Sequence, residues 1–295
     1  MNTPKVLFAL AVIFGSAGAP VFADTFTFIA TDGVWDRHQN WDGQPGQIPG
    51  ANDKAIIPGG RICRISFNDQ NALEVEVQAG GTLSIEGWRI ILHGATMTLN
   101  GTLRLKEAGG AVGGILFIDA THDYEIIADP NEQGLIDATG NTLFAEFWGQ
   151  DQHTLEIGQR VTMVGKVYIV LIDLKNNGVI KVNAANDELR LGTWALEVEI
   201  SGNGTFEVSA GLINFDVVTF GAAPFIGEIK VQGSGTMKFS FRDVIIAPAG
   251  TKFIVSGGTL RIETNVVSAG GSLTWTGGTI SVASAKNIQW TPASP

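Results

Sequence analysis

Cysteine is almost absent from this chain of 295 residues, since Cys63 is the only one. No disulfide within the chain can therefore stabilise the fold. Cys63 stands in an alternating run of apolar and polar residues at positions 62–67, which predicts a strand residue and not a catalytic thiol. Charged residues are also few, at 16% against 44% apolar residues, so we expect stability to come from backbone hydrogen bonds and a large apolar core.

Long apolar runs are missing beyond the first residues of the chain. Lys5 precedes an apolar run at residues 6–14, and small residues follow at positions 21–23, which together predict a signal peptide over residues 1–23. A run of nine residues is too short for a membrane span, which needs about 20. We therefore expect an exported protein without a membrane span that starts at Asp24 and is secreted, with the periplasm or the cell surface as alternatives.

Positive charge is scarce, because 19 Lys and Arg stand against 29 Asp and Glu and give a net charge of −10. Loss of Lys5 with the signal peptide leaves −11. This balance argues against nucleic acid or an anionic membrane surface as a partner. The nucleophile elbow, the phosphate-binding loop and the His-Glu-x-x-His zinc motif are absent as well, so nothing in the sequence predicts a metal site or a cofactor.

Helical periodicity is not sustained anywhere after residue 23, whereas glycine is abundant at 38 residues. Glycine repeatedly precedes a short alternating strand, in units such as Gly81-Thr82-Leu83, Gly101-Thr102-Leu103, Gly204-Thr205-Phe206, Gly235-Thr236-Met237 and Gly258-Thr259-Leu260. The intervals between neighbouring units are 20, 103, 31 and 23 residues, and lengths of 20 to 31 match one coil of a solenoid. The pattern predicts an all-β protein, a single-stranded parallel β-helix that is right-handed by the general rule for parallel crossovers, with a β-sandwich as the alternative.

The organisation along the chain follows from where these units occur. After the signal peptide we expect an N-terminal cap over residues 24–60, solenoid repeats over 61–285 and a C-terminal tail over 286–295. An open solenoid exposes strand edges at its ends, and the predicted caps argue for a monomer.

The N-terminal part also carries distinctive motifs: Trp35, Asn40-Trp41, the turn at residues 48–53 and the unit at residues 77–85. In this order they resemble the start of secreted bacterial β-helix proteins and are similar to the G8 domain, a glycine-rich extracellular module. The resemblance covers residues 33–110. It implies an extracellular or cell-surface location and, for some relatives, binding of or action on polysaccharides, but it transfers no catalytic residue.

Two polar clusters are candidate catalytic sites. The first contains Asp119, His122 and Asp123, where alternation along a strand would place the two acids on one face and the imidazole on the other. The second contains Glu146, Asp151 and His153, where an extended chain would place Asp151 and His153 on one face. Paired acids near an imidazole suit acid–base chemistry on polysaccharides, although solvated turns explain both clusters more simply.

Tryptophans within the repeats are candidate sugar-binding residues, with Trp148, Trp194 and Trp275 as the ligand-binding candidates. Large aromatics also fill solenoid cores. Asp53, near Asn52 and Asp42, suits calcium by its oxygens, but a turn that bonds its own backbone accounts for it.

These observations favour a secreted, non-catalytic β-solenoid that serves in extracellular binding, adhesion or matrix structure, with a polysaccharide or a cell-surface component as partner. The alternative is a polysaccharide lyase or glycoside hydrolase that uses acids on the solenoid face, with Asp119, Asp123, Glu146 and Asp151 as the first acids to test.

Overall fold

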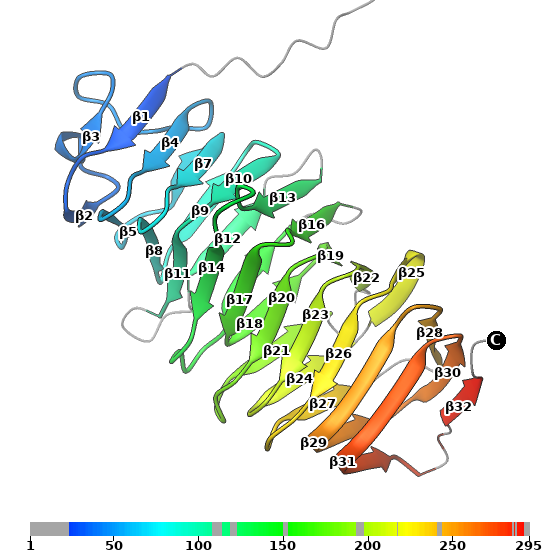
Figure 1. Cartoon of the computed structure of the whole chain (residues 1–295). Coiled ribbons are helices and arrows are strands. Elements are labelled where there is room, and N and C mark those ends of the chain that lie inside the picture. Colours follow the sequence, from blue (N-terminus) through cyan, green and yellow to red (C-terminus); the bar gives the residue numbers. More distant parts are fainter. Residues whose placement is uncertain are drawn as a thin grey trace, which may run out of the picture.

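The protein is a β-solenoid whose strands stack in parallel (Figure 1). The computed structural model describes residues 24–107, 114–118, 123–149, 153–192, 198–216, 218–240, 244–284, 286 and 288–291. Within these residues the one helical element is the short 3-10 turn η1 (His38–Asn40). The predicted parallel β-helix is confirmed, and the β-sandwich is wrong because the stacked strands pair in parallel.

Each coil contributes one strand to each of three faces. Face A begins with β1, whose outer edge pairs antiparallel with β3 (Trp41–Asp42), and β28, β30 and β32 continue it as a separate three-stranded sheet. The strands of face A are, in order, β1 (Thr25–Phe28), β4 (Lys54–Ile57), β7 (Glu74–Val77), β10 (Thr96–Leu99), β13 (Tyr124–Ile127), β16 (Thr154–Ile157), β19 (Asp173–Asn176), β22 (Val198–Gly202), β25 (Val218–Phe225), β28 (Val244–Pro248), β30 (Asn265–Ala269) and β32 (Ile288–Thr291).

Face B follows face A in every coil. Its strands are β2 (Asp32–Val34), β5 (Ile62–Ile65), β8 (Thr82–Glu86), β11 (Thr102–Lys106), β14 (Gly134–Ala138), β17 (Val161–Gly165), β20 (Val179–Val182), β23 (Thr205–Val208), β26 (Glu228–Val231) and the first halves of β29 (Lys252–Ile262) and β31 (Ser272–Val282).

Face C completes the coil. It contains β6 (Gln70–Ala72), β9 (Arg89–Leu92), β12 (Ile115–Ile118), β15 (Ala145–Trp148), β18 (Val167–Val170), β21 (Glu188–Leu191), β24 (Leu212–Phe215), β27 (Thr236–Phe239) and the second halves of β29 and β31. Both of these long strands bend from face B to face C at a pair of glycines, Gly257-Gly258 and Gly277-Gly278.

Alternation along each strand builds one continuous core. Every second side chain points inward, so stacked coils place apolar residues above one another, such as Cys63 and Leu83 on β5 and β8. Near the C-terminal coils the core is aromatic: the rings of Phe215 and Phe239 stack 4.6 Å apart, and Phe206 packs edge-on against Phe215. Cys63 lies in β5, as predicted for a strand residue, and is fully buried, which raises the pKa of its thiol well above the ordinary value.

The glycines mark corners where neighbouring backbones approach too closely for a side chain. A Cβ at Gly101 would lie 2.4 Å from the carbonyl oxygen of Gly81, and one at Gly204 would lie 2.2 Å from that of Gly178. These glycines form a column at the corner between faces A and B. Gly235 and Gly258, whose units look identical in sequence, form a second column between faces B and C. The Gly-Thr units therefore occupy two different corners of the coil.

The segment predicted as an N-terminal cap contains β1, β2 and β4, which stack in parallel with the strands of the solenoid, and β3, which covers the outer edge of β1. Trp35 is fully buried, its ring lies 4.8 Å from that of Trp41, and Trp41 Nε1 donates to the carbonyl of Trp35 at 2.7 Å. Asp53 closes the turn at this end, because its carboxylate accepts from the backbone N–H groups of Gly50 and Asp24. This is the backbone-bonded turn that the sequence predicts for Asp53.

The corner column makes a prediction about stability. Gly101→Ala should lower the free energy of unfolding by about 1 to 3 kcal/mol, because the new methyl group overlaps the carbonyl oxygen of Gly81. Gly50→Ala is the control, since its Cβ would meet only the carboxylate of Asp53 at 3.4 Å. Urea unfolding of both variants followed by circular dichroism measures the difference. Equal midpoints would show that the corner tolerates a side chain.

Candidate functional site

The outward side chains of face C form a continuous row, which we call the face C row. One residue per coil stands in parallel register with the next, from β9 to β29. Successive strands of a sheet lie about 4.8 Å apart, so neighbouring members of the row can act on one ligand. The members are Arg89, Ile115, Glu146, Tyr168, Arg190, Asn214, Lys238 and Arg261.

The row begins with a hollow of about 210 Å³ lined by Arg89, Ile115, Glu146 and Trp148. Trp148 Nε1 donates a hydrogen bond to Glu146 Oε2 at 2.5 Å, which orients the indole beside the carboxylate. Arg89 is held by Asp69 through Nε at 2.9 Å. The hollow thus combines an aromatic ring, a carboxylate and a guanidinium, each fixed by a neighbour.

An aromatic and cationic cluster follows one coil further along. The rings of Phe144 and Tyr168 lie 5.7 Å apart, and the guanidinium of Arg190 lies over both, 5.3 Å from the first and 5.9 Å from the second. Lys166 Nζ lies 5.1 Å from the Phe144 ring. Such contacts between cations and rings hold the side chains against the sheet. Burial is the main reason why the pKa of Tyr168 is raised.

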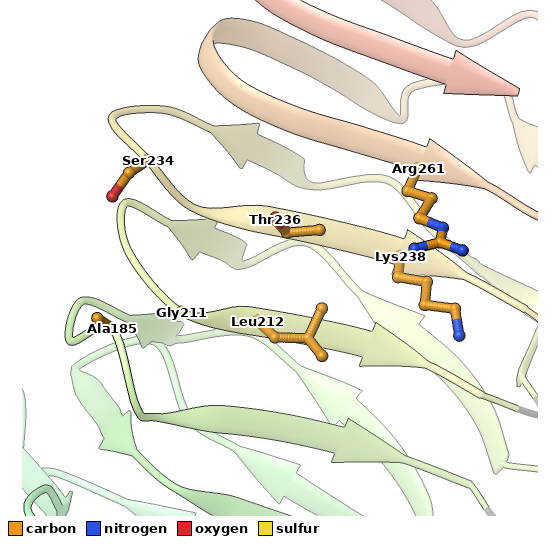
Figure 2. A pocket seen from close by; sticks show the side chains of 7 residues that line it. All are labelled: Ala185, Gly211, Leu212, Ser234, Thr236, Lys238 and Arg261. Carbon is orange, nitrogen blue, oxygen red and sulfur yellow. The ribbon is translucent and has the colours of Figure 1, made fainter.

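A second hollow, of about 470 Å³, lies over the later coils of the same face (Figure 2). Thr236, Lys238 and Arg261 line it together with Leu212, Gly211, Ser234 and Ala185. Lys238 Nζ lies 2.9 Å from a carboxylate oxygen of Glu263, and Arg261 bonds the other oxygen at 2.5 Å. The hydrogen bond from Lys238 is the largest reason why the pKa of Glu263 is lowered.

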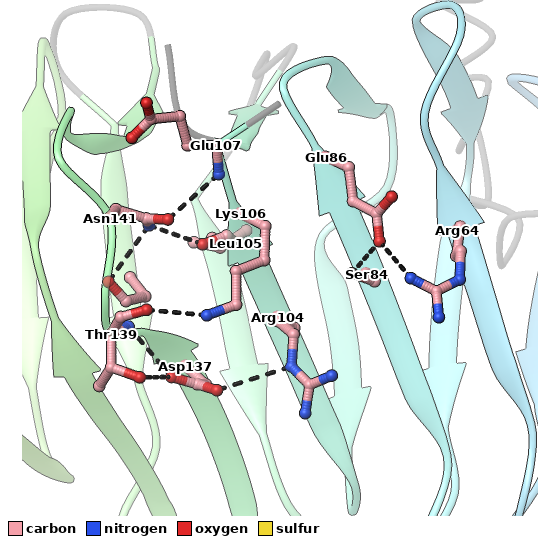
Figure 3. Close-up of polar contacts among 11 residues, drawn as sticks. Arg64, Ser84, Glu86, Arg104, Leu105, Lys106, Glu107, Asp137, Thr139 and Asn141 are labelled. Carbon is pink, nitrogen blue, oxygen red and sulfur yellow. Dashed lines mark hydrogen bonds and ion pairs between the residues drawn. The ribbon is translucent and has the colours of Figure 1, made fainter. Parts of the chain in front are cut away.

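A notch of about 430 Å³ lies beside the row, between the turns of two coils that are separated by one further coil. Gly140, Asn141 and Thr142 line one side and residues 184–187 the other, with Lys166 between them. Asn141 is fixed in place: Nδ2 donates to the carbonyl of Leu105 at 2.8 Å, and Oδ1 accepts from the backbone of Glu107 (Figure 3). Asp187 is only 3% exposed, and its Oδ2 has no hydrogen-bond partner.

Among the candidate catalytic residues, Glu146 lines the first hollow of the face C row, and the others fall into two groups. Asp119 and Asp151 lie outside the described residues, as does His122. Asp123 and His153 come together across neighbouring coils, with Asp123 Oδ1 3.9 Å from His153 Nδ1 and 2.8 Å from the backbone N–H of Thr154. Stacking of coils, and not proximity in sequence, makes this contact, so the sequence did not reveal it.

The candidate ligand-binding tryptophans also separate. Trp148 lines the hollow at the start of the face C row. Trp275 lies on β31, the last strand of faces B and C, and is 59% exposed. Trp194 lies outside the described residues.

Tyr168, Phe144 and Arg190 were missed by the sequence analysis. The signal that could have found Tyr168 and Arg190 is their outward position in alternating strands. Phe144 precedes β15 and gives no such signal. Recognising the signal requires the register between coils, which the sequence alone does not supply.

Comparison with known proteins adds no relative. No family model matches the chain, and no curated protein or solved structure matches it either. The resemblance to secreted bacterial β-helix proteins and the G8 domain therefore rests on the sequence motifs alone. Among the residues that the structure describes, no helix is long and apolar enough to span a membrane, and no three His, Cys, Asp or Glu side chains gather as metal ligands.

The carboxyl groups of Asp187, in the notch, and Asp137, on β14, should affect the stability of the protein in opposite directions. Burial raises the pKa of Asp187, so the native state keeps its proton where the unfolded chain has lost it. Stability associated with Asp187 therefore falls as pH rises from the ordinary Asp pKa to the raised one. Asp187→Asn should unfold at higher urea than the parent protein at pH 7, and this gain should disappear near pH 3.

Asp137 provides the matched control. Burial opposes its ionisation, but hydrogen bonds from the Thr139 hydroxyl at 2.7 Å and backbone N–H at 3.0 Å hold its pKa below the ordinary value (Figure 3). Its contribution is present at neutral pH and lost as pH falls through the lowered pKa. Asp137→Asn should therefore destabilise the protein at pH 7. The same sign for both variants in urea titrations would contradict this assignment.

Proposed function

We propose that this protein is an exported, non-catalytic β-solenoid that binds an extended neutral polysaccharide along the face C row. The observation that carries the proposal is that Tyr168 and Arg190 stand in register on successive coils of one face, while Trp148 projects from the same face one coil earlier, two residues beyond the row and next to a hollow. A sugar ring offers an apolar face that stacks on aromatic rings and hydroxyl groups at its edge that bond planar polar side chains. The row supplies both kinds of contact.

The charges favour a neutral ligand over an anionic one. The cations of the row are already paired: Arg89 with Asp69, Arg190 with Glu188, and Lys238 with Glu263. The chain as a whole has a net charge of −10. These arginines and lysines therefore offer hydrogen bonds without a strongly positive surface that would attract polyanions.

Face A is a poorer candidate for the same role. Its outward positions carry mainly threonines and acids, the acids including Glu74, Glu125, Glu156, Asp173 and Glu199. It presents no described aromatic side chain at an outward strand position. Without rings to stack on, it lacks the apolar half of a sugar-binding surface.

Substitution in the row tests the proposal. Trp148→Ala and Tyr168→Ala should each weaken glycan binding about 10-fold, which corresponds to about 1.4 kcal/mol of lost stacking. Affinity electrophoresis against soluble glucans, mannans and xylans, with a polyuronate as the anionic comparison, identifies the ligand. Isothermal titration then gives the dissociation constants.

Trp275→Ala is the control variant, because this equally aromatic and more exposed residue lies on the last coil, outside the row. It should bind like the parent protein. Failure of every glycan to retard the parent protein, or equal losses in all three variants, would refute the proposed function.

The second candidate function is cleavage of a polysaccharide, favoured by the contact between Asp123 and His153. In that case the imidazole would exchange a proton with the glycan and the carboxylate would orient the ring. Incubation of the purified protein with the same glycans, scored for new reducing ends and unsaturated products, separates the two functions. Turnover that is abolished by both Asp123→Asn and His153→Ala would establish the enzyme instead of the binding protein.

A further inference from the structure

The two ends of the solenoid differ in how their strand edges are covered. At the N-terminal end β3 pairs with the outer edge of β1, and Trp35 and Trp41 are buried beside it. At the other end β31 pairs with β29 along one edge and with no other described strand. An unpaired edge offers a row of N–H and C=O groups that can pair with another strand.

The inward side chains of β31 leave the apolar core open at this end. Leu273, Trp275, Ile280 and Val282 stand in register with the core residues Phe253, Val255, Leu260 and Ile262 of the preceding coil. Trp275 is nevertheless 59% exposed and Val282 40% exposed. The last coil thus shows to solvent the kind of surface that every other coil covers with its successor.

Charge does not protect this edge. No Asp, Glu, Lys or Arg occurs between Glu263 and Lys286, so the whole of β31 is neutral. Natural sheet edges that remain single usually carry lysine, proline or an inward-pointing charge that prevents pairing. The absence of any such residue over an 11-residue strand favours pairing with a second strand of the same kind.

The shape of β31 is compatible with its own copy. The strand has two arms of four residues, 272–275 on face B and 279–282 on face C, joined by the bend at Gly277-Gly278. Each arm carries two inward apolar side chains, Leu273 and Trp275 on the first and Ile280 and Val282 on the second. A two-fold axis through the bend places the first arm of one copy antiparallel to the second arm of the other and keeps all four side chains inside.

We propose that the protein forms a symmetric tail-to-tail dimer in which β31 of each copy pairs antiparallel with β31 of the other. The two apolar columns become one continuous core, and the contact closes after two copies because both surfaces are used. Head-to-tail stacking is disfavoured because β3 occupies the outer edge of β1, so that among the described strands only the three-residue β2 offers an edge at that end. The resulting rod would carry one face C row on each half, so this proposal concerns the end of the solenoid and does not depend on glycan binding.

A cysteine at the bend reports this geometry directly. Thr276 is exposed and lies next to the proposed axis, so Thr276→Cys should form a disulfide between two copies under mild oxidation. A disulfide requires Cα atoms within about 7 Å. The matched control is Ser256→Cys at the same bend of β29. One further coil in each copy adds roughly 10 Å to the distance between the two cysteines, so no disulfide should form. The native Cys63 is fully buried and should not take part.

Mass in solution supplies the second measurement. Light scattering coupled to size exclusion should give the mass of two chains at about 50 µM and dissociation on dilution. Trp275→Lys should give a monomer, because pairing would bury an unpaired charge. Ile254→Lys adds the same charge on the outer side of the preceding coil and should remain a dimer. Circular dichroism of both variants shows whether the solenoid is retained.

A dimer that is cross-linked at position 276 and not at position 256 supports the proposal. A parent protein that stays monomeric at all concentrations, assemblies larger than two chains, or a dimer that position 276 fails to cross-link would each overturn it.

Discussion

Parallel stacking of coils in register is the constraint on which the rest of this structure depends. In the strands of an inner coil, backbone N–H and C=O groups bond the coils before and after it. The chain can therefore pass from one face to the next only at a corner. At two of these corners the coils come so close that a Cβ has no room, and glycine occupies them. Inward positions are equally restricted, because each must fill the column that its neighbours above and below also fill.

This constraint leaves the outward positions free for other roles. On face B they pair across coils, as in the contact of Arg64 with Glu86 on β8 at 2.7 Å (Figure 3). On face A they carry mainly threonines and acids. On face C they carry rings and guanidinium groups, and there the register converts residues far apart in sequence into a line. A rigid scaffold of this kind presents a long surface with little loss of conformational entropy on binding.

The same stacking leaves each end to be covered, since a coil without a neighbour has unpaired strand edges and an exposed apolar core. The N-terminal end is covered by β3 and two buried tryptophans. The C-terminal coil keeps the inward pattern of all the others but leaves Trp275 and Val282 largely exposed. This difference between the two ends arises from the fold. The alternation of apolar and polar residues is the same at both ends and does not reveal it.

The sequence by itself determined the class of fold, because alternating strands introduced by glycine have few other ways to bury an apolar face. It also placed Cys63 in a strand and Asp53 in a turn, since both depend on neighbours within a few residues. Only the tertiary structure decided which corner each Gly-Thr unit occupies, that Asp123 meets His153, and that Trp148, Tyr168 and Arg190 lie on one face. The physical reason is that coil length varies with the loops between strands, and the register set by interstrand hydrogen bonds exists only after the coils have stacked.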